Sequence, residues 1–297
     1  MSKVLINGIA SGYVSVADRG LHYGDGVFET IACVGKHPLF IQQHMDRMEN
    51  GARKLNIHFP DRQLFLDDIN CLLRDSESNS VIKLILTRGC GKRGYRYEPT
   101  QIPTRICMLS AWPDYVAHWR EHGITARFCQ TQLSTNSQLA GIKSLNRLDS
   151  VLASSELGQA FNEGFLSDID GNVIEGTMSN IFIVLNDALV TPDLSRCGVN
   201  GVMRELIIDI AHNSNIEVET RNISRNELLE SREIFISNSV IGACVVKQLE
   251  QQSYNIDTMT RTINKILDKR IEVDAKAAAY TDCRGRCAAC NYCLCCK

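Results

Sequence analysis

The chain has 297 residues, which suits one large domain or two of ordinary size, because single hydrophobic cores stop growing near ~250–300 residues. Hydrophobic residues make up 44% of the chain and charged residues 22%, values close to globular averages, which excludes a disordered chain. The 32 Lys and Arg against 34 Asp and Glu give a formal net charge of −2, too balanced for a dedicated nucleic-acid binder or a polybasic membrane binder.

The 13 cysteines are distributed unevenly: seven are scattered through the body of the chain and six crowd into its last fifteen residues. The odd number and wide spacing in the body indicate buried free thiols in a reducing compartment. The first apolar run is interrupted by Asn7 and Gly8, unlike a signal peptide, and no stretch approaches the ~20 apolar residues of a membrane helix. We therefore expect a cytoplasmic protein.

The first part of the chain predicts an α+β domain. From residue 3 to about 41, short apolar runs alternate with Gly-rich and Asp-rich breaks, which is typical of an antiparallel sheet joined by tight turns. Apolar residues at helical spacing follow, and after them come two further strand patterns. Residues 1–112 are expected to form this small domain, with helices near 41–55 and 62–73 and strands at 81–87 and 104–111.

The second part is predicted to be a larger α+β domain, residues 124–274. A polar segment opened by Pro113 and closed by Gly123 separates the two patterns, so residues 113–123 are expected to be the linker. A strand at 124–132 and a helix beginning after Lys143 are predicted next. Two hairpins follow, of which Asp170-Gly171 gives a stronger turn signal than Asn186-Asp187. Strands and helices then mix without regular βαβ alternation, which argues against a Rossmann sheet.

Two residues with reactive side chains stand out. Lys143, in LAGIKSLNRL, has no carboxylate within four residues on either side, and Arg147 lies one helical turn ahead. This setting disfavours the protonated amine, and a lysine beside another cation can form Schiff bases, although a solvated surface lysine fits the same pattern. Glu175 follows Val173 and Ile174 at a predicted strand end. Unless solvated, its carboxylate needs a cationic partner from the protein or from a cofactor.

Two further segments suit anions. In GVNGVMRELIIDI, Gly198 and Gly201 precede a helix predicted from Val202. A glycine-flanked helix N-terminus offers free N–H groups to a phosphate, although an ordinary capped helix gives the same pattern. The loop RGCGKRGYRYEP carries four cations against Glu98 alone, which suits a multiply anionic small molecule and a solvated loop equally well.

The order of the segments is more specific than any one of them. YGDGVFET, HMDRM, GIKSLNRL, VIEGTMSNIF, GVNGVMR and ISNS follow one another in a succession that resembles the class IV pyridoxal phosphate enzymes, which include branched-chain and D-amino acid aminotransferases. The resemblance covers about residues 3–250. Within the family it is strongest to the aminodeoxychorismate lyases, because of LAGIKSLNRL, the RGCGKRGY loop and Thr30. It implies a two-domain α+β fold of the class IV aminotransferase type, with the cofactor at the domain interface.

The resemblance also assigns roles to residues. In the family, the lysine matching Lys143 binds pyridoxal 5′-phosphate as an aldimine and later moves protons, and the glutamate matching Glu175 faces the pyridine nitrogen. A carboxylate there keeps the nitrogen protonated, and a pyridinium withdraws electrons from the substrate. The other cofactor-binding residues that the family implies are the phosphate ligands Arg47, Val202, Met203 and Ser239, together with Asn180.

For the lyase branch, the resemblance implies conversion of 4-amino-4-deoxychorismate to 4-aminobenzoate and pyruvate in folate biosynthesis, with proton abstraction by Lys143 before elimination. Thr30 resembles a position that carries a hydroxyl near the reacting carbon. By charge and loop position, Arg93 and Arg96 are expected to bind the substrate carboxylates. The family forms homodimers in which a small-domain loop reaches the neighbouring active site. We therefore expect a homodimer acting on a small molecule, with neither nucleic acid nor a membrane as partner.

Residues 275–297 depart from the family pattern. Their cysteines form C-x2-C pairs, which are typical of zinc sites, but the usual second pair and the apolar residues for a core are missing. We expect a disordered extension and assign no metal ligand, with thiolate metal binding as the alternative. Two other functions stay open. A D-amino acid or branched-chain aminotransferase would need a keto acid acceptor, and a non-enzymatic thiol-rich metal or interaction protein would show no absorbance near the aldimine band.

Overall fold

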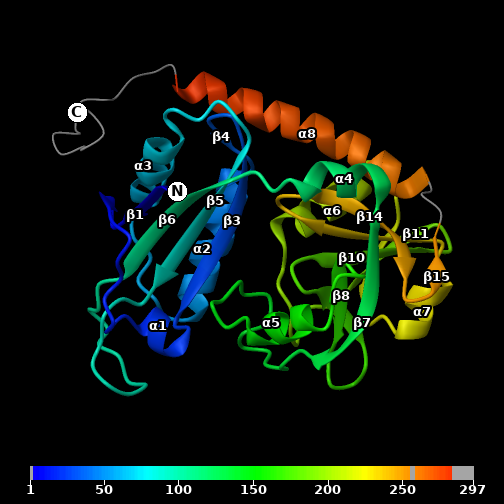
Figure 1. Cartoon of the computed structure of the whole chain (residues 1–297), viewed down its shortest axis with the longest axis horizontal. Coiled ribbons are helices and arrows are strands. Elements are labelled where there is room, and N and C mark those ends of the chain that lie inside the picture. Colours follow the sequence, from blue (N-terminus) through cyan, green and yellow to red (C-terminus); the bar gives the residue numbers. More distant parts are fainter. Residues whose placement is uncertain (1–2, 255–257, 283–297) are drawn as a thin grey trace.

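The computed structural model describes residues 3–254 and 258–282, with side chains up to residue 275. Two β-sheets form two lobes that lie side by side, and one long helix runs across both of them (Figure 1). The chain therefore has the mixed α+β character expected from its sequence.

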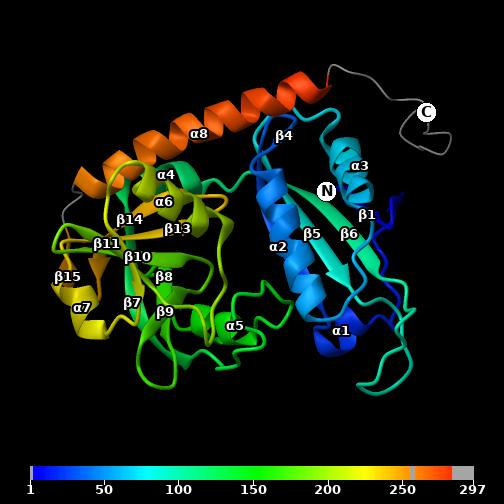
Figure 2. The ribbon, with the colours of Figure 1, turned by 180° about the vertical axis from the view of Figure 1, so that it is seen from behind.

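The first sheet has six antiparallel strands in the order β2-β1-β6-β5-β3-β4. Its buried face packs against α2 and α3, which lie in front of the sheet in Figure 2. Met45, Met48 and Ala52 recur at helical spacing on α2, and all three are buried against the sheet. The elements of this lobe are β1 (Lys3–Ile6), β2 (Ile9–Ala10), α1 (Arg19–Tyr23), β3 (Gly26–Val34), β4 (His37–Pro38), α2 (Ile41–Lys54), α3 (Arg62–Leu73), β5 (Ser80–Thr87) and β6 (Thr104–Ala111).

The second sheet has nine strands and mixes parallel with antiparallel pairs. Strand β9 pairs with both β8 and β10, which closes part of the sheet into a ring and places Glu175 opposite Asn180. The elements are β7 (Ile124–Gln132), α5 (Leu148–Ser155), β8 (Glu163–Ser167), β9 (Val173–Gly176), β10 (Asn180–Leu185), β11 (Ala188–Pro192), α6 (Val202–Asn213), β12 (Val218–Arg221), α7 (Arg225–Glu230), β13 (Glu233–Asn238), β14 (Gly242–Leu249) and β15 (Gln252–Ser253).

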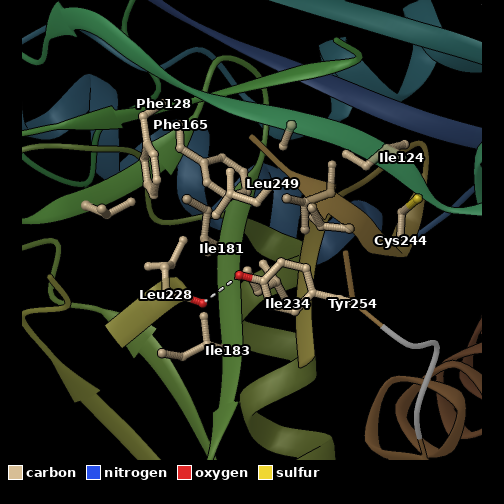
Figure 3. Packing of buried hydrophobic residues seen from close by; sticks show 14 of the residues in the cluster. Ile124, Phe128, Phe165, Ile181, Ile183, Leu228, Ile234, Cys244, Leu249 and Tyr254 are labelled. Carbon is tan, nitrogen blue, oxygen red and sulfur yellow. Dashed lines mark hydrogen bonds between the residues drawn. The ribbon is translucent and has the colours of Figure 1, made fainter. Parts of the chain in front are cut away.

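A large apolar core fills the inside of this ring (Figure 3). It includes the aromatic pair Phe128 and Phe165, whose ring centroids lie 6.4 Å apart in an edge-to-face arrangement. Tyr254 enters the core from the end of the sheet, and its hydroxyl donates to the carbonyl oxygen of Leu228 at 3.2 Å. The polar end of the tyrosine is thereby satisfied where water is excluded.

The segment 113–123, expected to be a linker, is instead mostly the helix α4 (Tyr115–His122). Val116 and Trp119 are three residues apart, so they face the same side of the helix, and both are buried in the core of the second lobe. The polar residues of the helix, His118, Arg120, Glu121 and His122, are exposed, which is why the segment resembled a linker. The interdomain segment is therefore part of the second lobe's packing.

Residues 275–282, expected to belong to a disordered extension, instead form the last part of a helix. This helix, α8 (Thr258–Asp282), is the last element that the structure describes. This helix packs on β14 and reaches β4 in the first lobe, where the Asp274 carboxylate accepts a hydrogen bond of 2.7 Å from the amide of Phe40. The Cys-rich residues 283–297 lie outside the described residues.

Two local expectations need correction. Asn186 and Asp187 both have positive φ, 50° and 65°, and form the tight two-residue hairpin turn, whereas Asp170-Gly171 lies in a wider loop between Ser167 and Val173. The helix expected directly after Lys143 begins only at α5. Leu145 donates its amide to the carbonyl oxygen of Gly26, which keeps the chain extended there.

Five of the seven cysteines of the body are buried, as predicted, whereas Cys71 is partly exposed and Cys90 is exposed. Burial raises the pKa of the Cys33 thiol to about 12, so it remains a neutral, small apolar side chain at ordinary pH.

Candidate active site

A cavity of about 590 Å³ lies where the two lobes face each other. Side chains from β3 and α2 of the first lobe line it together with residues from β9, β10, α6 and β13 of the second. The cavity contains every catalytic and cofactor-binding residue expected from the sequence, which the structure brings together from positions far apart in the chain: Thr30, Arg47, Lys143, Glu175, Asn180, Val202, Met203 and Ser239.

Lys143 is placed by backbone pairing with the first lobe. The amide of Phe28 donates to the carbonyl oxygen of Lys143 at 3.0 Å, and Ser144 forms a β-bridge with Val27. Phe28 and Thr30 alternate with buried positions on β3 and both line the cavity. The Lys143 Nζ atom lies over the face of the Phe28 ring, 4.5 Å from its centroid.

The electrostatic setting of Lys143 favours the neutral amine. Removal from water and the positive charges of Arg47 and Arg147 lower the pKa of Lys143 to about 8. The carboxylates of Glu29 and Glu175 act in the opposite direction but do not outweigh these effects. The amine is thus available as a nucleophile or a base closer to neutral pH than an exposed lysine.

Glu175 is a buried carboxylate in the cavity wall, 4% exposed. Its Oε2 atom accepts a hydrogen bond of 2.7 Å from the amide of Val199, and its Oε1 atom lies 3.9 Å from Nη1 of Arg147. Burial raises the pKa of Glu175, and these two contacts only partly oppose the rise. A cationic group of a ligand beside this carboxylate would favour its ionised form.

The start of α6 presents free amides to the cavity. Gly201 is the N-cap residue and has no side chain to accept a hydrogen bond, so the first amides of the helix, at Val202 and Met203, have no capping partner. A Cβ atom at Gly201 would lie 2.0 Å from Oδ1 of Asn180, so any larger residue here would have to displace the Asn180 side chain. Free amides and the helix dipole make this end a site for an anion.

The Arg47 side chain stands next to this helix end. Its Nη1 donates to the carbonyl oxygen of Asn200 at 3.0 Å, and Asn180 Nδ2 donates to the carbonyl oxygen of Val199 at 2.8 Å. These two contacts hold a guanidinium and an amide beside the α6 amides. Ser239, in the turn after β13, adds a hydroxyl to the cavity wall.

The sequence reasoning missed several residues of the cavity wall. Ser237 on β13 is one: its hydroxyl is buried and has no hydrogen-bond partner among the described residues. Tyr115 reaches the cavity from α4. It was missed because its polar neighbours made the segment resemble a linker. Arg147 was noted only for its effect on Lys143, yet its side chain also lines the cavity. Among the described residues, no group of His, Cys, Asp and Glu could hold a metal ion.

Arg93 and Arg96 do not line the cavity of their own chain in the part that the structure describes. Both are exposed on the loop between β5 and β6, which hangs below the first lobe in Figure 1. Arg19 fixes this loop, because its guanidinium donates to the carbonyl oxygens of Gly94 and Tyr95 at 2.8 and 3.0 Å. Within one chain, the structure therefore does not bring these two arginines to the expected substrate site.

Comparison with known proteins gives a consistent result. A sequence model described as Amino-transferase class IV matches residues 26–249. The chain is 32% identical over 254 residues to an aminodeoxychorismate lyase of Vibrio harveyi, covering 85% of this chain and 93% of that protein. It is also 32% identical over 267 residues to a putative branched-chain-amino-acid aminotransferase of Methanocaldococcus jannaschii, covering 89% and 92%.

Solved structures agree with the sequence comparisons. The crystal structure of 4-amino-4-deoxychorismate lyase from Pseudomonas aeruginosa aligns with a TM-score of 0.85 at 36% identity, covering 90% of this chain and 98% of that one. A branched-chain amino acid aminotransferase from Escherichia coli has the same fold, with a TM-score of 0.82. No helix among the residues described above is long and apolar enough to cross a membrane.

Proposed function

Because the chain belongs to the class IV aminotransferase family, we propose that it is an aminodeoxychorismate lyase, which converts 4-amino-4-deoxychorismate to 4-aminobenzoate and pyruvate. The observation that carries the proposal is the meeting of Lys143, Glu175 and the free N-terminus of α6 in one cavity that Thr30 also lines. We place the reaction in folate biosynthesis and the protein in the cytoplasm as part of the same proposal.

The residues of the cavity fit pyridoxal 5′-phosphate as the cofactor. An amine with a lowered pKa suits its aldehyde, a buried carboxylate suits its pyridine nitrogen, and free helix amides suit its phosphate. When bound, the cofactor supplies an electron sink for the carbanion of the substrate.

The binding residues divide between the two ends of the cofactor. In this proposal, the phosphate is held by Arg47, the amides of Val202 and Met203, and the hydroxyl of Ser239. The charge of the dianion is then shared by a guanidinium, a helix dipole and a hydroxyl. Asn180 holds the backbone before α6 through its bond to Val199.

Glu175 acts at the other end of the cofactor. Held by the Val199 amide, its carboxylate keeps a proton on the ring nitrogen, because a buried negative charge is stabilised by an adjacent positive one. With the cofactor bound, this charge pairing would make its ring strongly electron-withdrawing.

Lys143 moves the proton. With a pKa lowered to about 8, its free amine is largely unprotonated in mildly alkaline solution and can take the proton from the amine-bearing carbon of the substrate. Positioned proton transfer of this kind contributes ~10²–10⁴-fold to the rate. The Thr30 hydroxyl faces the same cavity and is assigned to the reacting carbon. Loss of the enolpyruvyl group then leaves an aromatic ring, which makes the elimination favourable.

The test is pyruvate release from 4-amino-4-deoxychorismate by the purified protein without any added keto acid. A lyase forms pyruvate and 4-aminobenzoate in equal amounts under these conditions. The aminotransferase of Methanocaldococcus jannaschii is as similar in sequence as the Vibrio harveyi lyase, so the same preparation should also receive branched-chain and D-amino acids with a keto acid. Turnover only when a keto acid is present would replace the lyase proposal with an aminotransferase.

We further propose that the enzyme is a homodimer in which Arg93 and Arg96 bind substrate carboxylates in the neighbouring subunit. Their loop lies away from the cavity of its own chain. On α5, beside the cavity, Leu148, Val151 and Leu152 form an apolar stripe that is 57–74% exposed, as expected for a surface that a second chain covers. Mixing inactive Lys143→Ala and Arg96→Ala subunits should restore activity, because mixed dimers regain one complete site. No recovery after confirmed subunit exchange would contradict the shared site.

A further inference from the structure

A buried carboxylate interrupts the apolar face of β3. Val27, Glu29 and Ile31 alternate along the strand and face α2, while Phe28 and Thr30 between them face the cavity. The Glu29 side chain is fully buried. A lone carboxylate in such a place costs several kcal/mol, so its partners on α2 explain why it is tolerated.

Those partners are Arg47 and His44, three residues apart on α2. Nε of Arg47 donates to Oε1 of Glu29 at 2.8 Å, and its Nη2 donates to Oε2. Nδ1 of His44, itself 1% exposed, lies 2.6 Å from the same Oε2 atom. Burial alone would raise the pKa of Glu29, but Arg47 and His44 lower it to about 2, so the carboxylate is ionised at ordinary pH.

The pairing leaves a defined part of Arg47 for the cavity. A guanidinium has five N–H donors in a fixed plane. Glu29 takes two of them, from Nε and Nη2, and the carbonyl oxygen of Asn200 takes a third, from Nη1. One donor on each terminal nitrogen remains, and Arg47 lines the cavity beside the α6 amides. Two donors in one plane match two oxygens of a phosphate.

We propose that Glu29 is a positioning residue for the cofactor phosphate, acting through Arg47, whose guanidinium it holds in the one orientation that offers two donors to the phosphate. The inference rests on the proposed pyridoxal phosphate function. Glu29 itself faces α2 and carries the same sign of charge as the phosphate, so its contribution is orientation and not direct contact. His44 holds the second oxygen of the carboxylate and completes the arrangement.

The experiment compares two ligands that differ only in the phosphate. Apoprotein is titrated with pyridoxal 5′-phosphate and with pyridoxal, and binding is followed by visible absorbance. Glu29→Gln keeps the shape of the side chain but loses the charge and one acceptor. It should raise the Kd for pyridoxal phosphate about ten-fold or more, as loss of an orienting partner does at other binding sites, and should leave the Kd for pyridoxal within two-fold.

The matched control is Glu49→Gln on the same helix. Glu49 pairs with Arg62 at the surface and does not line the cavity, so neither Kd should change. An equal loss for both ligands in Glu29→Gln, or no loss for either, overturns the positioning role. Wild-type protein that binds neither ligand removes the proposed function and this inference with it. Wild-type protein that binds pyridoxal phosphate, beside an unchanged Glu29→Gln variant, removes the inference alone.

A double variant keeps the test valid if Glu29→Gln fails to fold. Glu29→Gln combined with Arg47→Gln leaves no unpaired charge inside the protein, unlike either single change. If Glu29 acts through Arg47, the double variant binds pyridoxal phosphate as weakly as Arg47→Gln and no more weakly. An additional loss in the double variant shows that Glu29 acts by another route and overturns the proposal.

Discussion

The amide of Phe28 on β3 donates a hydrogen bond of 3.0 Å to the carbonyl oxygen of Lys143. This bond joins the segment before α5 to the first lobe. The bridge between Val27 and Ser144 extends this contact. Backbone pairing of this kind fixes the Cα position of the lysine, while the Phe28 ring limits where its amine can go. The two lobes thus meet at the residue to which the chemistry is assigned.

Replacement of Lys143 should abolish the reaction. Lys143→Ala removes the proposed base, and we expect a loss of at least ~10²-fold in kcat in the pyruvate assay, since proton transfer by a positioned group contributes ~10²–10⁴-fold. Lys83→Ala is the matched control, because Lys83 also contacts the Phe28 ring, with its Nζ 5.2 Å from the centroid, but is exposed on β5 and does not line the cavity. Equal rates in Lys143→Ala and wild type would remove this lysine from the mechanism.

The pH dependence of cofactor loading should report the pKa of Lys143. A lowered pKa favours the neutral amine, and only the neutral amine attacks an aldehyde, so the loading rate rises with pH and levels off once the amine is deprotonated. With a pKa of about 8, the midpoint should lie near pH 8 and not near the ordinary 10.5. Stopped-flow absorbance of apoprotein mixed with pyridoxal phosphate between pH 6 and pH 10 measures it.

A variant shows whether neighbouring charge causes the shift. Arg147→Met removes one of the cations that lower the pKa of Lys143, so the midpoint should move to higher pH. A midpoint that stays the same or moves to lower pH would mean that Arg147 does not act on the amine through its charge.

Glu175→Gln should separate binding from catalysis. The glutamine can still accept the Val199 amide bond but cannot stabilise a proton on the ring nitrogen. We expect kcat to fall by on the order of 10²-fold, while the Kd for pyridoxal phosphate changes by less than ten-fold. Exchange of the substrate proton with solvent deuterium, followed by NMR, measures the affected step directly. A larger effect on Kd than on proton exchange would assign Glu175 to binding alone.

Local patterns were sufficient to predict much of the fold. The helix expected at residues 62–73 and the strands expected at 104–111 and 124–132 agree with α3, β6 and β7 at both ends. The helix α3 has a periodic apolar face and a clear boundary residue, Asp61, whose side chain caps it by accepting the amide of Gln63. The α4 segment was misread because only Val116 and Trp119 face the core, too few to give a periodic signal.

The candidate site divides in the same way. Lys143 and the start of α6 have recognisable neighbours in the sequence, whereas Glu29 and Ser237 sit in strands whose patterns show only that most of their positions are buried. The pairing of Glu29 with Arg47 joins a strand to a helix across the interior of the lobe, and no spacing rule encodes it. For Arg93 and Arg96 the sequence pattern was misleading in a different way. Their charge predicted that they bind the substrate, but the fold of a single chain does not place them in the cavity.

Ser237→Ala should have opposite effects on stability and on ligand binding. The hydroxyl of Ser237 has no partner among the described residues, and an unsatisfied buried polar group costs ~1–3 kcal/mol. Removing it should leave the free energy of unfolding of the apoprotein unchanged or raise it by about 1 kcal/mol, as measured by urea denaturation. If a cavity ligand uses this hydroxyl, the Kd for pyridoxal phosphate or the KM for the substrate should rise about five-fold, the equivalent of one hydrogen bond.

Ser167 provides the control for this prediction. Its hydroxyl on β8 is also buried and unpartnered, but Ser167 does not line the cavity. Ser167→Ala should therefore reproduce the effect on unfolding without any change in Kd or KM. If Ser237→Ala weakens neither cofactor nor substrate binding, the Ser237 hydroxyl is an unsatisfied polar group within β13 and does not contact a ligand. A Kd or KM change of equal size in both variants would attribute the effect to the sheet and not to the cavity.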